Sequence, residues 1–154
     1  MVYILKKGGV MNKNVLATVF VIFLGFVLAT SCEKAKDEIL GITISGTVTN
    51  GGQPIDGAFV LLVNNINEIV GGSPLSNGSI TLGNGTYTII QVDDGTYYVA
   101  AIKDENGNKS YDFGTDPIGW YGHEDSITHL TIPDSIMVSG NDVSGIDVDT
   151  LYAQ

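Results

Sequence analysis

The chain of 154 residues has no arginine, one tryptophan and one cysteine, and few positive charges of any kind. Its seven lysines stand against 17 acidic residues. All 17 acidic residues but only four lysines follow Ser31, so the stretch from Cys32 onward carries a formal net charge of −13. Such a surface repels nucleic acid and anionic lipid. We therefore expect no nucleic-acid partner.

The scarcity of thiols also limits the chemistry of the chain. With Cys32 as its only cysteine, the chain has no internal disulfide and no multi-thiolate metal site. The serine-nucleophile motif G-x-S-x-G is absent. The two histidines, His123 and His129, stand six residues apart, a spacing that fits no familiar pair of metal ligands. We expect no enzymatic activity.

What the N-terminal segment does contain is an uncharged apolar run at residues 15–29, preceded by lysine and followed by small residues. A membrane-spanning helix needs roughly 20 apolar residues, and this run is shorter. Its length and flanks are typical of the hydrophobic region of a signal peptide. We predict a signal helix within a peptide covering residues 1–31, with Met11 as an alternative start.

The apolar run ends in Leu28-Ala29-Thr30-Ser31-Cys32. This sequence resembles the lipobox of bacterial lipoproteins, although Ala29 stands where the strict pattern has leucine. The resemblance implies that Cys32 is lipidated and becomes the new N-terminus; the alternative is an ordinary signal peptide with an incidental cysteine. Several acyl chains anchor a protein stably, whereas a single chain does so only marginally.

Residues 32–40 then form a charged tether. Residues 33–38 (EKAKDE) resemble the acidic sorting signals that send some lipoproteins to the cell surface, and the alternative is a solvated linker. We expect a protein held by its lipid anchor at the outer membrane or cell surface.

Residues 41–154 are predicted to form one β-domain, because short apolar runs alternate with turn signals and no helical period is sustained. Residues 42–49 alternate with a period of two, and residues 58–63 suit a central strand buried on both faces. Asp93-Asp94-Gly95 predicts a hairpin turn between two runs within residues 85–103. Further strands are expected at 79–82, 127–132, 136–138 and 146–152. About seven short strands favour an all-β Greek-key sandwich of the prealbumin-like or immunoglobulin-like kind.

Four short motifs support this fold class: Gly46-Thr47-Val48, residues 54–60 (PIDGAFV), Gly85-Thr86-Tyr87 and Gly95-Thr96-Tyr97. Together they resemble the transthyretin-like, or carboxypeptidase regulatory-like, sandwich over about half of the chain after Cys32. The resemblance implies the fold and says nothing of function, because such sandwiches host many roles.

An Asp- and Asn-rich stretch at residues 104–116 carries oxygen side chains at the spacing used by calcium-binding loops. Lys109 stands where the turn glycine is expected and Thr115 where such loops have glutamate. The alternative is a solvated turn between strands. The predicted calcium ligands are Asp104, Asn106, Asn108, Ser110, Asp112 and Asp116.

Trp120 and Tyr121 follow this stretch within residues 117–122 (PIGWYG). Together the two stretches resemble a group of uncharacterised secreted bacterial proteins in which a DxNGNGxxD loop precedes a GxPxEGYG segment. Aromatic faces in an acidic loop suit stacking on a sugar or peptide, whereas the alternative is a hydrophobic plug over the end of the sandwich.

Two functions follow from these patterns. The first is a non-catalytic structural or accessory module in the cell envelope, membrane-anchored and stabilised by calcium, that supports an envelope protein. The second is a module that binds glycan or peptide through Trp120 and Tyr121. An exposed Trp120 beside a groove favours binding, and a buried Trp120 favours the structural role.

Overall fold

The structure is a computed structural model that describes residues 40–75 and 78–153. The predicted signal peptide, Cys32 and the tether up to residue 39 lie outside the described residues. The described residues belong to the compact unit that begins at Leu40. Within the described ranges, no helix has the length and apolarity needed to cross a bilayer.

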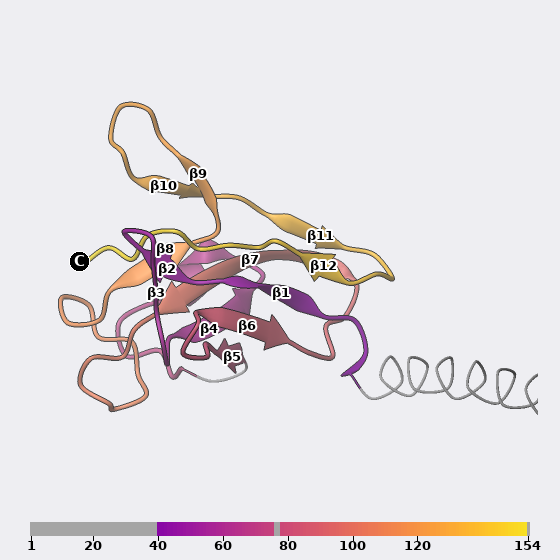
Figure 1. Cartoon of the computed structure of the whole chain (residues 1–154), viewed down its shortest axis with the longest axis horizontal. Coiled ribbons are helices and arrows are strands. Elements are labelled where there is room, and N and C mark those ends of the chain that lie inside the picture. The colour runs from indigo at the N-terminus through magenta and orange to yellow at the C-terminus, as the bar shows by residue number, and fades with distance from the viewer. Residues whose placement is uncertain (1–39, 76–77, 154) are drawn as a thin grey trace, which may run out of the picture. The chain divides into compact units, whose positions relative to one another are not determined.

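The described part of the chain is almost entirely β-structure (Figure 1), as the sequence pattern predicted. A single 3₁₀ turn, η1 (Ile66–Glu68), interrupts it. The strands are β1 (Ile44–Thr47), β2 (Thr49–Asn50), β3 (Gln53–Pro54), β4 (Phe59–Val63), β5 (Gly78–Ile80), β6 (Thr86–Ile89), β7 (Gly95–Ile102), β8 (Ile118–Trp120), β9 (Gly122–Glu124), β10 (Thr131–Pro133), β11 (Ile136–Val138) and β12 (Val143–Ser144).

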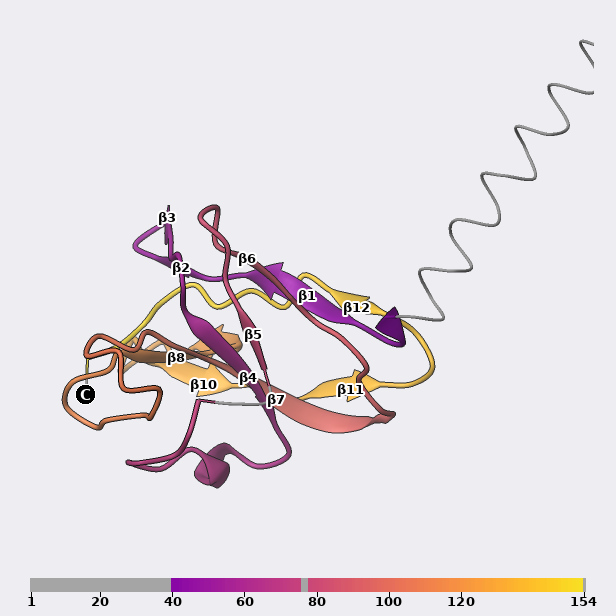
Figure 2. The ribbon, with the colours of Figure 1, turned by 90° about the horizontal axis from the view of Figure 1, so that it is seen from below.

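Two main sheets form a sandwich-like arrangement (Figure 2). The first has the strand order β12-β1-β6, and the second has the order β11-β7-β4-β5, with β8 also paired to β7. In the first sheet β1 runs antiparallel to β6, which sets Gly46 opposite Tyr87, and parallel to β12. In the second sheet the long strand β7 pairs with β4 along one edge and with β8 and β11 in succession.

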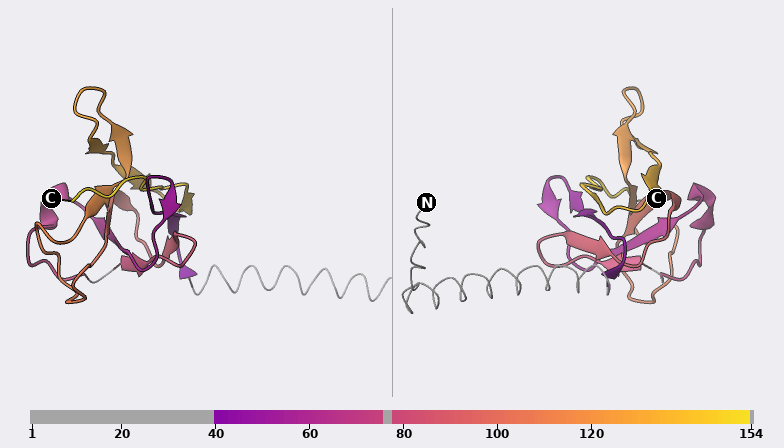
Figure 3. Two further views of the ribbon diagram at one scale, coloured as in Figure 1. Left: turned by 60° about the vertical axis from the view of Figure 1, so that its left-hand side comes forward. Right: turned by 90° about the vertical axis from the view of Figure 1, so that its right-hand side faces the viewer.

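Two small hairpins complete the described structure. Strands β2 and β3 form one, and β9 and β10 form the other. The β9–β10 hairpin lies in sequence between β8 and β11, which both pair with β7, so the chain leaves the sheet edge and returns to it. Figures 1 and 3 show this hairpin standing out from the body of the fold.

The main core lies between the two sheets. Ile44 belongs to β1 of the first sheet, and Val48 follows that strand directly. Val60, Val99 and Ala101 belong to the second sheet, and all five residues are fully buried. Their burial follows the period of two expected when one face of each sheet is packed. This cluster is called the inner core below.

A second cluster covers the opposite face of the β4–β7 pair. Leu61, Ala100 and Ile102, which alternate with the inner-core residues, pack there against Tyr111 and Ile118. This cluster is called the outer core below. Residues 58–63 are thus buried on both faces of a central strand, which confirms that prediction.

In the last segment, residues 146–152, the predicted burial pattern is confirmed, but the strand expected there does not form. Ile146 and Val148 are buried, whereas Asp147 is half-buried and Asp149 exposed. Only β12, just before it, is continuous ladder; the segment itself makes single bridges, Val148 to Val48 and Tyr152 to Ile118. It therefore runs from the first sheet to the edge of the second.

Several local predictions were wrong. The strand expected at 127–132 begins only at Thr131, because residues 125–130 form the turn of the β9–β10 hairpin. The Asp93-Asp94-Gly95 turn does not form a hairpin, because β6 pairs with β1 and β7 with β4, in different sheets. Both strands bury side chains in the inner core from opposite sides, and that burial outweighs local turn propensity. The described residues contain twelve short strands, not seven, because loops cross between sheets and break the ladders. Trp120 lies on strand β8, not in a loop, because it pairs with Ala100.

Candidate functional site

The Asp-rich stretch forms a closed loop between β7 and β8, held by its own side chains. Asp104 accepts hydrogen bonds from the backbone N–H groups of Gly107 (2.7 Å) and Lys109 (2.9 Å). Gly107 and Lys109 both have positive φ, 74° and 61°, which curls the chain around the carboxylate. The glycine that calcium loops place at the turn is thus replaced by a lysine in the same left-handed region.

The two asparagines of the loop point their amide groups at Asp112. The Nδ2 groups of Asn106 and Asn108 donate to Asp112 Oδ2 at 2.8 and 2.5 Å. Their Oδ1 atoms accept from the N–H groups two residues ahead, those of Asn108 and Ser110. Ser110 also forms a β-bridge with Pro74. The loop thus gathers Asn106 and Asn108 around Asp112, whereas the carboxylate of Asp104 is bound to the backbone of Gly107 and Lys109.

Asp116 closes the loop from inside the protein. Its side chain is fully buried, and its two oxygens accept hydrogen bonds from the N–H groups of Glu105 (3.0 Å) and Asp112 (2.8 Å). A buried carboxylate satisfied by two backbone donors links the first and last turns of the loop.

The donor set bears on whether a cation fits this loop. Asp104, Asp112 and Asp116 each already accept two N–H hydrogen bonds. Across residues 40–75 and 78–153, no three His, Cys, Asp or Glu side chains are grouped so as to hold a metal ion. A bound cation would use the remaining lone pairs and would displace the asparagine amide groups from Asp112.

The loop has a packing role through Tyr111. This ring is buried in the outer core, and its backbone pairs with Gly72 and Ser73 at 2.7 Å in both directions. Burial raises the pKa of the Tyr111 hydroxyl above its usual value, and the negative charge of Asp116 raises it further. The Asp-rich loop thus helps to cover the outer face of the second sheet.

Trp120 and Tyr121 point to opposite faces of the sheet, as neighbours on a strand do. Trp120 is half-buried and packs against the outer core, whereas Tyr121 packs against the inner core. The backbone of Tyr121 extends β8, because its N–H donates to Val99 O at 2.9 Å. The structure therefore does not unite the two aromatic rings in one recognition surface.

The backbone beside Trp120 is crowded by the last segment of the chain. A Cβ atom on Gly119 would lie 2.1 Å from the carbonyl oxygen of Thr150. Tyr152 and Ile118 exchange both backbone hydrogen bonds, at 3.0 and 2.8 Å. Glycine at position 119 thus lets the C-terminal segment lie against β8 and form one wall of the surface around Trp120.

Three hollows surround Trp120, and its side chain lines each of them. One, called the polar hollow, has a volume of about 210 Å³. It lies between the β9–β10 hairpin and the C-terminal segment. Besides Trp120, its wall includes Glu124, His129, Asp147, Asp149 and Tyr152.

The second, called the apolar hollow, adjoins the first and shares Trp120, Thr131 and Tyr152 with it. Its volume is about 430 Å³, and Leu130 and Pro133 of the hairpin supply much of its apolar wall. A third hollow of about 400 Å³ lies on the other side, where Trp120 meets Tyr111 and the exposed ring of Phe113.

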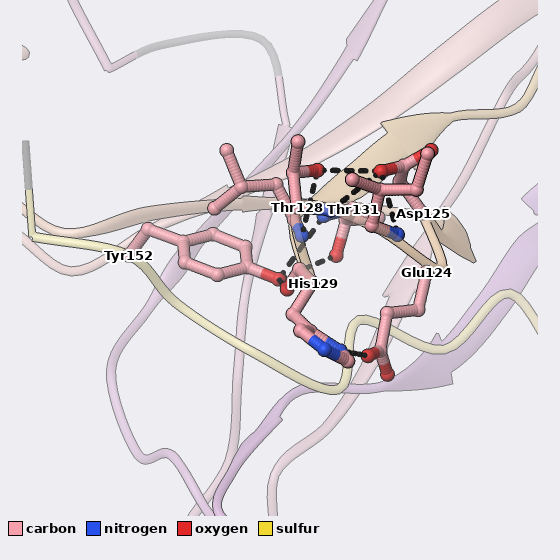
Figure 4. A network of polar contacts seen from close by, with 8 residues as sticks. Glu124, Asp125, Thr128, His129, Thr131 and Tyr152 are labelled. Atoms are coloured by element: carbon pink, nitrogen blue, oxygen red, sulfur yellow. Dashed lines mark hydrogen bonds and ion pairs between the residues drawn. The ribbon is translucent and has the colours of Figure 1, made fainter.

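The β9–β10 hairpin is held in shape by a polar network (Figure 4). At its tip the Asp125 carboxylate accepts hydrogen bonds from the N–H and hydroxyl groups of Thr128 (2.7 and 2.8 Å) and from the N–H of Ile127 (3.1 Å). These bonds lower the pKa of Asp125 below its usual value. The pattern is that of a side chain that satisfies a tight turn.

Each histidine of the hairpin has its own carboxylate. His129 Nδ1 lies 2.5 Å from Glu124 Oε1, and His123 Nδ1 lies 3.0 Å from both oxygens of Asp134. The hydroxyl of Tyr152 lies 3.1 Å from the N–H of Thr131, which donates to it, and 3.0 Å from the Thr131 hydroxyl. This contact joins the C-terminal segment to the hairpin (Figure 4), and both residues line the polar hollow.

Sequence reasoning missed most residues of the polar hollow. The acidic face of residues 146–152 was recognised, but nothing in the sequence indicated that Asp147 and Asp149 would face Glu124 and His129. These positions lie more than fifteen residues apart, and the crossing of the last segment between the sheets brings them together.

Comparison of the chain with protein-family models, with curated proteins and with solved structures yields no match.

Proposed function

We propose that the chain is a non-catalytic, lipid-anchored module of the cell envelope that binds a ligand at the surface around Trp120. The observation that carries this proposal is that one half-buried tryptophan lines three adjoining hollows. Ligand sites combine an apolar or aromatic wall with a few polar groups, and the polar and apolar hollows together have this composition.

The anchor is part of the proposal. A signal peptide over residues 1–31, lipidation of Cys32 and a tether over residues 32–40 would hold the domain at the outer membrane or the cell surface. The support is the sequence pattern up to Cys32. In expressing cells fed a labelled fatty acid, the wild-type chain should carry label and Cys32→Ala should not. Equal labelling of the two would contradict the anchor.

The finer fold assignment is likewise proposed: a prealbumin-like Greek-key sandwich similar to carboxypeptidase regulatory-like domains. The pairing of Gly46 with Tyr87 supports it, because the two residues belong to the motifs that carry the resemblance.

The test of binding uses Trp120 itself, since its emission comes from the only tryptophan of the chain. We expect its fluorescence to shift when the full chain, in detergent, is titrated with a panel of oligosaccharides and short peptides. Calorimetry on Trp120→Ala should show loss of binding with the circular dichroism spectrum retained. Met137→Ala is the matched control, because Met137 is exposed and lines none of the three hollows. A panel without a responding member would contradict the proposal.

A second candidate is a structural module that supports an envelope protein, stiffened by calcium bound to the Asp-rich loop. It is favoured by the position of Tyr111, which links the loop to the outer core. The full chain should then melt at a higher temperature in millimolar calcium than in EDTA, because a ligand that binds only the folded state stabilises it. Asp104→Ala and Asp112→Ala should each abolish the shift. Equal melting temperatures would make the loop a solvated turn.

A further inference from the structure

We infer that the polar and apolar hollows form one site for an extended basic peptide segment, with a lysine or arginine side chain in the polar hollow and an apolar side chain in the apolar hollow. The inference rests on the proposed binding role of Trp120 and names its ligand class. The two hollows share Trp120, Thr131 and Tyr152, so one ligand can contact both.

The negative charge of the polar hollow favours the lysine or arginine side chain of the ligand. Three carboxylates line it, and His129 is the one basic side chain in its wall. Glu124 is paired with His129, whereas Asp147 accepts hydrogen bonds from the N–H and hydroxyl groups of Thr47, which are neutral. Asp149 is exposed. The hollow therefore stays negative even when His129 is protonated.

No lysine of the described residues neutralises this charge. Lys103 donates to the carbonyl oxygen of Asp56 at 2.7 Å, and Lys109 belongs to the Asp-rich loop; neither lines the hollow. A cation brought by a partner thus meets uncompensated carboxylates. The net charge of −13 from Cys32 onward draws such a partner to the protein over a longer range.

The aromatic walls favour a cation with an apolar stem over an inorganic ion. Trp120 and Tyr152 both line the polar hollow, and aromatic faces attract ammonium and guanidinium groups. The volume of about 210 Å³ suits a single side chain. Arginine and lysine place apolar methylene groups behind their charge, which suits a hollow with both aromatic and acidic walls.

The apolar hollow favours the apolar side chain of the ligand. Leu130 and Pro133 line it beside Trp120, and Leu130 is 53% exposed. In an extended peptide, residues i and i+2 point to the same face, about 7 Å apart. A basic residue and an apolar residue two positions along would therefore enter the neighbouring hollows together. A neutral glycan would leave Asp147 and Asp149 without a charged partner.

The test uses the full chain in detergent and three acetylated, amidated peptides: Gly-Arg-Gly-Leu-Gly, the same peptide with glutamine for arginine, and the same peptide with alanine for leucine. Trp120 emission and calorimetry both follow binding. We expect the first peptide to bind at least about five-fold more tightly than either analogue, and its affinity to fall as sodium chloride rises to 0.5 M, because salt screens exposed charge pairs.

Two variants locate the charge recognition. Asp149→Asn and Glu124→Gln should each weaken the arginine peptide about five-fold or more and leave the glutamine peptide unchanged. Glu68→Gln is the matched control, because it removes an exposed acidic charge that lines none of the hollows. If the affinity for the arginine peptide changed neither with salt nor in these two variants, the inference would be overturned.

The outcomes separate this inference from the proposed function. If an oligosaccharide such as maltotetraose binds in a manner lost in Trp120→Ala, while no arginine peptide binds, the ligand class is wrong and the binding role stands. If neither class of probe binds, the proposed function fails as well. Binding of the arginine peptide with the expected salt and variant dependence supports both.

Discussion

The hydroxyl of Tyr87 donates a hydrogen bond of 2.5 Å to the carbonyl oxygen of Ile146, over the strand residue Gly46. Gly46 lies directly opposite Tyr87 in the β1–β6 ladder. Because Gly46 has no side chain, the C-terminal segment can lie close enough for the Tyr87 hydroxyl to reach it. A Cβ on Gly46 would lie 2.0 Å from that same carbonyl oxygen. Three segments far apart in sequence thus meet at one buried contact.

Gly46→Ala should strongly destabilise the fold, because the new methyl group would overlap the Ile146 carbonyl and displace the C-terminal segment. We expect a loss of about 1–3 kcal/mol in the free energy of unfolding, measured by urea denaturation. Gly83→Ala is the control, since Gly83 has open space around its Cβ position and no positive φ. Its stability should stay within about 0.5 kcal/mol of wild type. Similar losses in the two variants would contradict this account.

Tyr87→Phe retains the ring and removes only the hydroxyl. The Ile146 carbonyl then loses a buried donor, which should cost about 1–3 kcal/mol of unfolding free energy. Tyr97→Phe provides the comparison, because the Tyr97 hydroxyl donates to Asp93 O at an exposed position. We expect a much smaller loss there, and equal losses would show that burial of the Tyr87 contact does not matter.

Alkali should also weaken the fold through Tyr87. Burial raises the pKa of Tyr87 well above the usual value of about 10, and the charge of Asp147 adds to the shift. The unfolded chain therefore releases this proton first, so the contribution is fully present below about pH 10 and is lost as pH rises toward the higher folded pKa. Unfolding free energies measured from pH 9 to 11 should fall less steeply for Tyr87→Phe than for wild type. Parallel curves would contradict the assignment.

Thr81 is a buried polar residue just after β5, and its hydroxyl bonds both sides of the turn between β3 and β4. It accepts from Ala58 N at 2.8 Å and donates to Ile55 O at 2.6 Å. Thr81→Val keeps the shape but leaves both groups without that partner, which should cost about 1–3 kcal/mol in urea denaturation. Thr86→Val, which loses an exposed hydroxyl contact with Asn84, should change stability by less than about 0.5 kcal/mol. A neutral Thr81→Val would show that water or another donor replaces the hydroxyl.

The turn at the tip of the β9–β10 hairpin should respond to acid in a specific way. Hydrogen bonds from Thr128 and Ile127 lower the pKa of Asp125, so the carboxylate stabilises the turn above its usual pKa and loses this effect as pH falls through the lowered value. In carbon-13 NMR, Asp125 should titrate below the usual range for aspartate. Thr128→Val should move its midpoint upward. An unchanged midpoint would contradict the hydrogen-bond cause.

The sequence predicted local structure best where burial alone decides it. Residues 58–63 are an unbroken apolar run and form the central strand β4, buried on both faces. The prediction from the sequence was wrong at Asp93-Asp94-Gly95, where an Asp-Gly pair favours a hairpin but β6 and β7 belong to different sheets. The candidate calcium ligands lie in one loop because they are neighbours in sequence. The residues that face Trp120 across the polar hollow are not neighbours, so no local pattern indicated them.

Sequence by itself determined the strand character of the chain, the acidic surface, the single tryptophan and the single thiol, because composition and periodicity are properties of short stretches. Only the tertiary structure decided which strands pair, that Trp120 and Tyr121 separate to opposite faces, and that the C-terminal segment crosses from one sheet to the other. That crossing depends on Gly46 and Gly119, where backbone atoms occupy the space of a missing side chain. These contacts join Gly46 to Ile146, 100 positions apart, and Gly119 to Thr150, 31 positions apart, and their energy exists only once the chain has folded.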